Sequence, residues 1–255
     1  MKQLNPYRKA LGLLFRRLIW DIDPRAWLAR RKLRRFRNIH AGEKCIICCN
    51  GPSLLDTDFN SIDGVKTIGL NKINLLYNKT SFRCDYVVAV NPFVIEQNYL
   101  YFSSCSEIIF LDAICARRNR LLNRQNILGI HTGVEGFAED CSFSVSQGYT
   151  VTYVALQLAF HMGFEKVALI GCDHSFIYSG GPNETNFFTG SDQNHFDPEY
   201  FKNSFWQNPD LNGSERSYLH ALASYSSANR LLVNCSARSE LTILPRMALI
   251  DFLNC

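Results

Sequence analysis

Residues 44–54, KCIICCNGPSL, restrict the fold of this chain more than any other stretch. The apolar run 46–49 indicates a strand that is covered on both faces. The turn that ends it contains Asn50, Gly51, Pro52 and Ser53, of which the glycine permits close approach and the serine can cap a helix. Because ligands in open α/β sheets bind outside the carboxyl ends of strands, these four residues are candidate nucleotide contacts. The alternative is an ordinary strand-to-helix turn.

Apolar strands alternate with helical patterns along most of the remaining chain. Helices are predicted at 150–162 and 214–229, and further strands at 66–71, 84–91, 107–111, 127–130, 167–171 and 230–234. This order predicts one α/β domain with a doubly wound, mostly parallel sheet and helices on both faces. The turn after the first strand has neither GxGxxG nor GxxxxGK[ST], which argues against NAD-linked dehydrogenases and P-loop NTPases.

Polar residues follow four of the predicted strands. Asn50, Asn71 and Asn91 each end a strand, and Asp173 follows a fourth. An amide offers both a donor and an acceptor without charge, which suits recognition of a base, a ribose or a phosphate. Each asparagine alone is an ordinary turn residue, but four polar groups at corresponding strand ends predict a site on one rim of the sheet.

Charge divides the chain unevenly. Residues 1–37 hold twelve lysines and arginines against two aspartates, a net charge of +10, whereas the rest holds fifteen against twenty-one. Leu11, Leu14, Phe15 and Leu18 recur at helical spacing, so 1–37 is predicted to be a basic amphipathic helical arm before a domain at 38–255. The arm suits an anionic membrane surface, or it docks on its own domain. It carries no nucleic-acid-binding motif, and we expect no nucleic-acid partner.

Ten cysteines in a large apolar chain do not indicate a disulfide scaffold. Cys45 and Cys48 have CxxC spacing but lie within a strand, which points them to opposite faces. We interpret most cysteines as buried and reduced. No signal peptide or spanning segment is recognisable, so the expected location is cytoplasmic, with peripheral attachment to the inner membrane face through 1–37.

Two long sequence blocks and two shorter segments resemble the MptE-like family, which combines 6-hydroxymethylpterin diphosphokinases with motility-accessory-factor relatives. The long blocks are the CNGPSL turn with GLNKI at 69–73, and TVTYVALQLAFHMGFEKVALIGCDHSF at 150–176. HFDPEYF at 195–201 and ARSELTILPR at 237–246 are similar to the glycan-associated branch. More distantly, the motifs resemble bacterial sialyltransferases that use CMP-sialic acid on a Rossmann-like domain.

The resemblance implies contacts for a nucleotide-activated donor. Asn50, Gly51 and Ser53 would hold its phosphate and ribose, with Asn71 and Asn91 beside them. The Thr150–Thr152 turn would meet the nucleotide, and Gly171 and Asp173 would line the pocket. The usual first glycine of the family's GNGPS turn is Cys49 here.

The catalytic histidine of the sialyltransferases has no counterpart at the matching spacing, near Asn212–Gly213. A long insertion at 174–212, rich in glycine and polar residues, suggests a lid or acceptor loop. Its His195 is our candidate general base, followed by His174 and His220, with Asp173 as the other catalytic candidate. The alternative for His195 is a loop histidine with a local hydrogen bond.

We therefore expect a nucleotide-dependent transferase. The preferred reaction is glycosyl transfer to a cell-surface glycan acceptor. The first alternative is pyrophosphoryl transfer from ATP to hydroxymethylpterin, which would need Mg²⁺. The second is a non-catalytic nucleotide-binding scaffold. Glycosyl transfer is expected to need no further cofactor. Asp56 and Asp58 have the DxD spacing of metal-dependent glycosyltransferases, but this spacing is common by chance and we assign no metal site.

Overall fold

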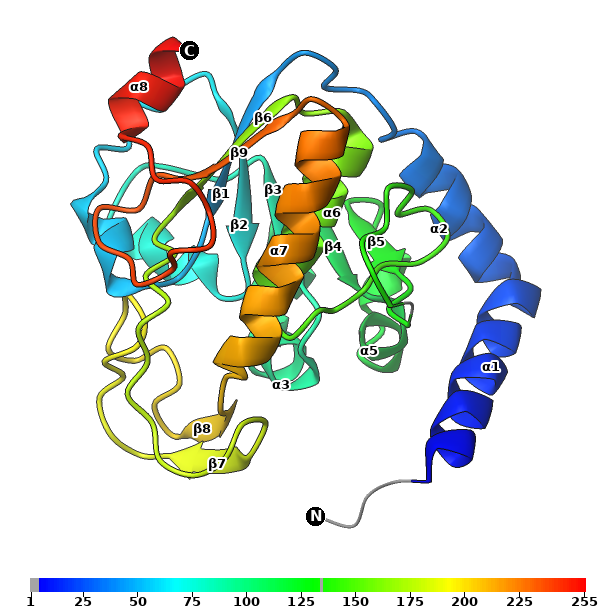
Figure 1. The fold of residues 1–255 in the computed structure, drawn as a ribbon. Coiled ribbons are helices and arrows are strands. Elements are labelled where there is room, and N and C mark those ends of the chain that lie inside the picture. Colours follow the sequence, from blue (N-terminus) through cyan, green and yellow to red (C-terminus); the bar gives the residue numbers. More distant parts are fainter. Residues whose placement is uncertain (1–4, 134) are drawn as a thin grey trace.

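A parallel seven-stranded sheet forms the centre of the computed structural model, which describes residues 5–133 and 135–255 (Figure 1). The spatial order is β5-β4-β3-β2-β1-β6-β9. The predicted α/β fold with a doubly wound parallel sheet is therefore confirmed. The strands are β1 Lys44–Cys48, β2 Lys66–Leu70, β3 Tyr86–Ala89, β4 Ile108–Asp112, β5 Ile127–Ile130, β6 Lys166–Ile170 and β9 Leu231–Asn234.

Helices cover both faces of the sheet, and side chains alternate between two hydrophobic cores. Cys45 and Ile47 of β1 belong to one core, Ile46 and Cys48 to the other, as strand geometry requires. The first core lies under α2 (Pro24–Arg34), α6 (Val151–Met162) and α7 (Leu211–Ser227). The second lies under shorter helices, which are η1 Pro52–Asp56, η2 Ile73–Asn78, α3 Pro92–Gln97, α4 Tyr99–Ser104, α5 Ala113–Arg118, η3 Leu121–Asn123 and α8 Leu249–Asn254.

The segment after the β1 turn differs from the expected capped helix. It is a 3₁₀ helix of five residues, η1, whose N-cap is Gly51 and whose cap makes no side-chain hydrogen bond. Ser53 lies inside this helix and its side chain bonds elsewhere. A single 3₁₀ turn has no macrodipole comparable to that of a long α-helix, so the helix-dipole argument for anion binding does not apply to η1, and the nucleotide contacts of this turn stay a prediction.

Residues 6–34 form two helices of different character. α1 (Pro6–Ile22) runs along one side of the molecule in Figure 1, and its Trp20 ring lies 5.4 Å from that of His131. α2 buries Ala26 and Leu33, and Leu33 belongs to the first core. Nε2 of His161 lies 2.9 Å from the carbonyl oxygen of Leu33. None of the described helices combines the length and the apolarity of a membrane span.

The insertion at 174–212 contains a separate antiparallel pair, β7 (Thr185–Phe188) and β8 (Ser204–Gln207). Its inner side is held by aromatic residues, because Phe196, Tyr200 and Phe201 are buried in the second core. Lys72, just after β2, donates from Nζ to the carbonyl oxygen of Tyr200 at 2.6 Å. The insertion is therefore packed against the carboxyl end of the sheet.

Candidate functional site

A pocket lies where the strand order of the sheet reverses. From β1 the chain continues to β2 on one side, while β6 pairs with β1 on the other. Loops on the two sides of such a switch point diverge and leave a crevice at the carboxyl ends of the strands. The crevice here has a volume of about 670 Å³, and Asn50, Asn71, Asn91 and Asp173 all line it. The four predicted rim residues are thus brought together.

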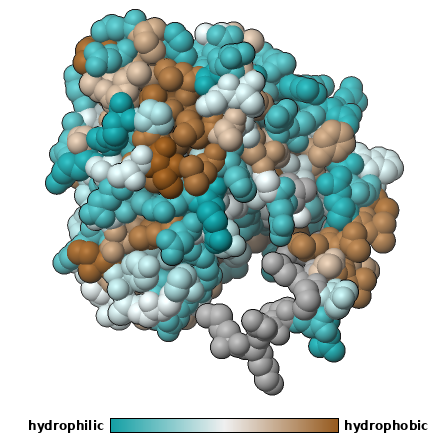
Figure 2. Space-filling view, viewed as in Figure 1, coloured by the Kyte–Doolittle hydropathy of each residue, from teal (hydrophilic) through white to brown (hydrophobic). Residues whose placement is uncertain are grey.

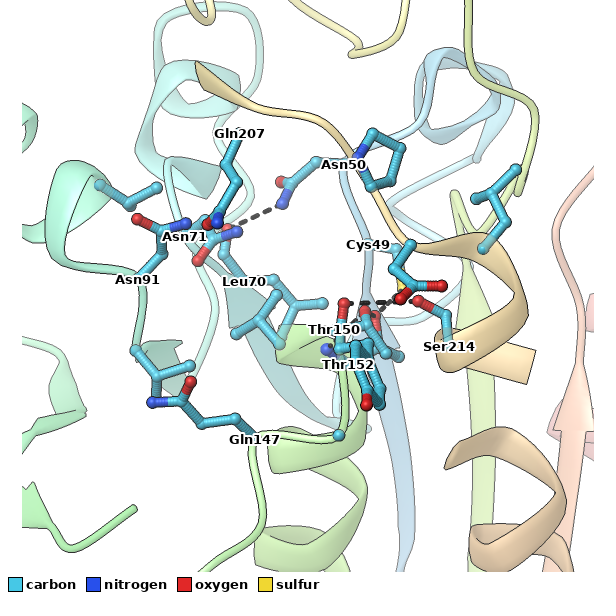
Figure 3. A pocket seen from close by; sticks show the side chains of 18 of the residues that line it. Cys49, Asn50, Leu70, Asn71, Asn91, Gln147, Thr150, Thr152, Gln207 and Ser214 are labelled. Atoms are coloured by element: carbon cyan, nitrogen blue, oxygen red, sulfur yellow. Dashed lines mark hydrogen bonds between the residues drawn. The ribbon is translucent and has the colours of Figure 1, made fainter. Parts of the chain in front are cut away.

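Asn50, which lines this pocket, has an unused hydrogen-bond acceptor. Its Nδ2 donates to the carbonyl oxygen of Leu70 at 3.1 Å, which fixes the amide against β2 (Figure 3). Its side-chain oxygen is buried, and no described residue donates to it. A buried polar atom without a partner costs free energy, and a bound ligand that donates a hydrogen bond recovers it. Asn50 is therefore prepared to accept from a ligand.

Gly51 and Ser53 hold the turn itself against the end of β6. Gly51 N donates to the carbonyl oxygen of Gly171 at 2.8 Å, and a Cβ on Gly51 would lie 2.7 Å from that oxygen. Glycine is required here because another backbone comes close. Ser53 N donates to Asp173 Oδ2 at 2.8 Å, and Ser53 Oγ donates to Oδ1 of the same carboxylate. Asp173 is thus committed to the turn.

The N-terminus of α6 forms another wall of the pocket. Thr150 is its N-cap and accepts from Thr152 N at 3.3 Å, while Thr150, Val151 and Thr152 all line the crevice. Oγ1 of Thr152 lies 3.8 Å from Sγ of Cys49. A hydrogen bond with the Cys172 thiol raises the pKa of Cys49, so it remains a neutral thiol at the pocket floor. With twelve residues, α6 presents a positive dipole end to this space.

His195 lies in the pocket wall and is held on two sides. Its Nδ1 lies 2.8 Å from Oδ2 of the buried Asp192. Its ring stacks on Tyr200 with 4.1 Å between centroids and 9° between planes. When the carboxylate accepts from Nδ1–H, Nε2 is left as the basic nitrogen. A histidine that is oriented in this way can accept a proton from a bound hydroxyl.

The other predicted histidines differ in position. His174 also lines the pocket, with a φ of +55° and its Nε2 3.3 Å from Oε1 of Glu215. His220 is exposed on α7 and is not a lining residue. Gly171 lines the pocket, whereas Pro52 and Ser53 do not. Asp56 and Asp58 line a different cavity near the C-terminus.

Lys72 holds part of the pocket wall in place through hydrogen bonds to Tyr200 and a cation–π contact with Phe201. Its Nζ lies 4.7 Å from the centroid of the Phe201 ring, and its backbone N donates to Tyr200 Oη at 3.1 Å. Burial lowers the pKa of Lys72 to about 8. It is not a lining residue, and it supports the segment that carries His195.

Several polar lining residues were not predicted from the sequence, namely Gln147, Tyr149, Gln207 and Ser214. Tyr149 has a φ of +85°, a strained conformation for a bulky residue, and its ring packs on Gly213. Gln207 comes from β8 and lies on the same side of the pocket as the asparagines in Figure 3. No sequence pattern predicts a positive φ at a tyrosine or the pairing of β8. These residues could therefore not be identified from the sequence.

Among known structures, the fold is similar to that of a glycosyltransferase. The structure of MAf glycosyltransferase from Magnetospirillum magneticum AMB-1 superposes with a TM-score of 0.55 at 14% identity. The match covers 86% of this chain and 38% of that one, so this chain spans well under half the length of its structural relative. At this identity the likeness concerns the fold.

The sequence model of the family described as "6-hydroxymethylpterin diphosphokinase MptE-like" matches residues 26–179, more than half of the chain. The chain therefore belongs to the MptE-like family, as its motifs predicted. A comparison with curated proteins finds no match.

Proposed function

We propose that this chain is a glycosyltransferase that moves a sugar from a nucleotide-activated donor to a cell-surface glycan acceptor. The family and the glycosyltransferase fold support a transferase in general terms. The observation that carries the proposal is the switch-point pocket, in which the unpaired amide oxygens of Asn50 and Asn71 and the hydroxyls of the α6 N-terminus meet an oriented histidine. Such a pocket can bind a nucleotide and activate a hydroxyl group beside it.

The donor phosphate fits best at the N-terminus of α6. Its first-turn N–H groups and the hydroxyls of Thr150 and Thr152 can solvate one phosphate, and the helix dipole favours its charge. The nucleoside would then extend toward Asn50, Asn71 and Asn91. None of the described lining residues is a lysine or arginine. This composition favours a donor with one phosphate over a polyphosphate.

In the reaction, Nε2 of His195 takes the proton of the acceptor hydroxyl. The hydroxyl oxygen forms a bond to the anomeric carbon of the sugar as the bond from that carbon to the phosphate oxygen breaks. The nucleotide phosphate leaves with the electron pair, and the α6 N-terminus stabilises its charge. Asp192 holds the imidazole and stabilises the imidazolium that forms. Asp173 acts as a positioning residue for the Asn50 turn.

Pyrophosphoryl transfer from ATP to hydroxymethylpterin is the second candidate, because the family description names that activity. It would place three phosphates and Mg²⁺ in the pocket. Three described acidic residues line the pocket: Asp173 already accepts from Ser53, Asp210 accepts from Gly213 N as the N-cap of α7, and Glu135 is exposed. The pocket composition therefore supports this candidate less well than glycosyl transfer.

We place the chain in the cytoplasm. Nine of its ten cysteines are buried as free thiols, including Cys49 and Cys172 beside the pocket. A reducing compartment keeps such pairs of neighbouring thiols from oxidising.

A thermal-shift screen tests the function. The intact chain is heated with CMP, CDP, UDP, GDP or ATP, each with and without Mg²⁺, because a ligand of the native state raises Tm by mass action. A nucleoside monophosphate that acts without Mg²⁺ supports glycosyl transfer, and a shift by ATP only with Mg²⁺ supports the diphosphokinase. Nucleotide binding without turnover of any matching nucleotide-sugar indicates a scaffold. No shift by any nucleotide contradicts all three.

A further inference from the structure

The outer face of α1 is an apolar stripe that no described residue covers. Its large side chains lie within an arc of about 100° at helical spacing. All of them are exposed, from 56% for Leu18 to 83% for Tyr7, and they are Tyr7, Leu11, Leu14, Phe15, Leu18 and Ile22. Figure 2 shows the hydrophobic patch on the side of the molecule where α1 stands. Six exposed large apolar side chains that adjoin one another on one helix mark an interaction surface.

The opposite face of α1 already has a partner, which fixes the orientation of the stripe. Trp20 packs beside His131, and Leu13 reaches the wall of the switch-point pocket. Arg17 pairs with Asp21 at 2.8 Å and reaches the carbonyl oxygen of Phe143 at 3.3 Å. Because these contacts use the inner face, the stripe points away from the domain and is free to meet another surface.

The charge of the segment that carries the stripe indicates what kind of surface the stripe contacts. The stripe belongs to a segment of net charge +10, residues 1–37, and Arg8, Arg31 and Arg35 are exposed on it. A symmetric contact with a second copy would bring two such segments together, and their repulsion opposes it. An anionic surface is attracted to the same segment. A basic helix with one apolar stripe is the form that inserts shallowly into an anionic bilayer.

The junction of the two helices adds an interfacial anchor. Trp27 of α2 is 58% exposed, and its Nε1 donates to the carbonyl oxygen of Asp21 at 2.7 Å. Its neighbour Leu28 is exposed as well. Tryptophan prefers the interface between headgroups and acyl chains, and arginine side chains extend from there to phosphates.

We propose that α1 docks the protein on an anionic membrane surface by inserting this stripe between the lipid headgroups. The apolar side chains supply hydrophobic burial, and the cations of the segment supply attraction to the phosphates. Leu13 lines the pocket from the other side of the same helix, so docking places the pocket about one helix diameter, ~10 Å, from the membrane. An acceptor carried on a membrane lipid would then reach His195, a step that rests on the proposed function.

Co-sedimentation with vesicles tests the docking. The full chain is mixed with vesicles of phosphatidylcholine alone, or of phosphatidylcholine and phosphatidylglycerol in equal parts, at low and high salt. We expect binding to the anionic vesicles only, weakened by salt. The double variant Leu14→Glu/Leu18→Glu should lower the partition coefficient at least about tenfold, because it removes two inserted side chains and adds two repelled charges.

The matched control is Leu100→Glu/Ile250→Glu, which adds the same charge at exposed apolar positions on α4 and α8. It should bind vesicles as the unaltered chain does. Absence of binding to anionic vesicles, or equal loss in both double variants, overturns the proposal. A dimer in light scattering that Leu14→Glu/Leu18→Glu abolishes would assign the stripe to self-association instead. Nucleotide-induced Tm shifts, measured on the same variants, report the pocket separately from the membrane contact.

Discussion

The backbone N–H of Phe196 donates a hydrogen bond to the carbonyl oxygen of Asn50, with 2.9 Å between nitrogen and oxygen. These residues are 146 positions apart, and the bond joins the middle of the insertion to the turn that ends β1. His195 precedes Phe196, so the bond sets the candidate base beside the residue with the unpaired side-chain oxygen. The insertion and the sheet thus form one pocket wall.

The first prediction concerns His195. His195→Ala should lower turnover of the matching nucleotide-sugar by about 10²–10⁴-fold, because a general base contributes that much. Donor affinity should change little, since the imidazole contacts the acceptor. Asp192→Asn should lower turnover less and shift its pH profile, because an amide no longer stabilises the imidazolium. Steady-state kinetics at saturating donor measures both effects.

His220→Ala serves as the control, because its side chain is exposed outside the pocket lining. It should leave turnover unchanged. His174→Ala tests the second candidate, which lines the pocket beside Glu215. If turnover in His195→Ala stays within a few-fold of the unaltered enzyme, the histidine-base mechanism is wrong.

A second prediction concerns nucleotide affinity. Asn50→Ala removes the unpaired acceptor and the bond from Nδ2 to Leu70. One lost hydrogen bond of about 1–2 kcal/mol weakens binding by roughly 5–30-fold. Titration calorimetry with the nucleotide found by the thermal screen measures the change. Asn60→Ala, an exposed asparagine outside the pocket, should bind normally. Equal affinities in the two variants would remove Asn50 from the site.

The sheet could be predicted from the sequence because buried strands leave continuous apolar runs. The predicted runs at 46–49 and 167–171 fall in the neighbouring strands β1 and β6, and the asparagines after β1, β2 and β3 reached one rim. Cys45 and Cys48 lie in separate cores, as strand alternation predicted. Local periodicity and the parallel topology are enough for these statements.

Other features depend on contacts that are distant in sequence. The need for glycine at position 51 is set by the carbonyl of Gly171, and the serine at 53 binds the carboxylate of Asp173. The apolar positions of α1 indicated an amphipathic helix, but the contacts of its inner face, such as Trp20 beside His131, are needed to show that the stripe points outward. A helical pattern in the sequence shows that one face is apolar, but it does not show what packs against that face.

The third prediction compares how much a buried residue of α2 and an exposed residue of α1 contribute to the free energy of unfolding. Leu33→Ala should lower the free energy of unfolding by about 2–5 kcal/mol, since it leaves a cavity in the first core. Leu14→Ala should change it by less than about 0.5 kcal/mol, because that side chain is exposed. Urea unfolding followed by circular dichroism measures both. Equal losses would mean that the outer face of α1 is buried in solution.

The last prediction concerns pH and the contact between α1 and the domain. His131 is 6% exposed, its ring lies beside that of Trp20 with 34° between the planes, and its Nδ1 lies 2.8 Å from Ser144 Oγ. Burial, and next the nearby Arg17, lower the pKa of His131 to about 4, whereas an unfolded histidine titrates near ~6.5.

Between these two pH values His131 binds a proton in the unfolded chain but stays neutral in the folded chain. The contribution of His131 to stability is therefore flat above about pH 6.5, falls by about 1.4 kcal/mol per pH unit below it, and levels off near pH 4. From pH 7 to pH 5 the loss is about 2 kcal/mol. His131→Gln cannot take up a proton, but it can still bond Ser144, so its free energy of unfolding should fall by about that much less over the same interval. Urea titrations of both proteins at pH 7 and pH 5 give the two differences, and identical losses would show that His131 takes up a proton in the folded state as readily as in the unfolded chain.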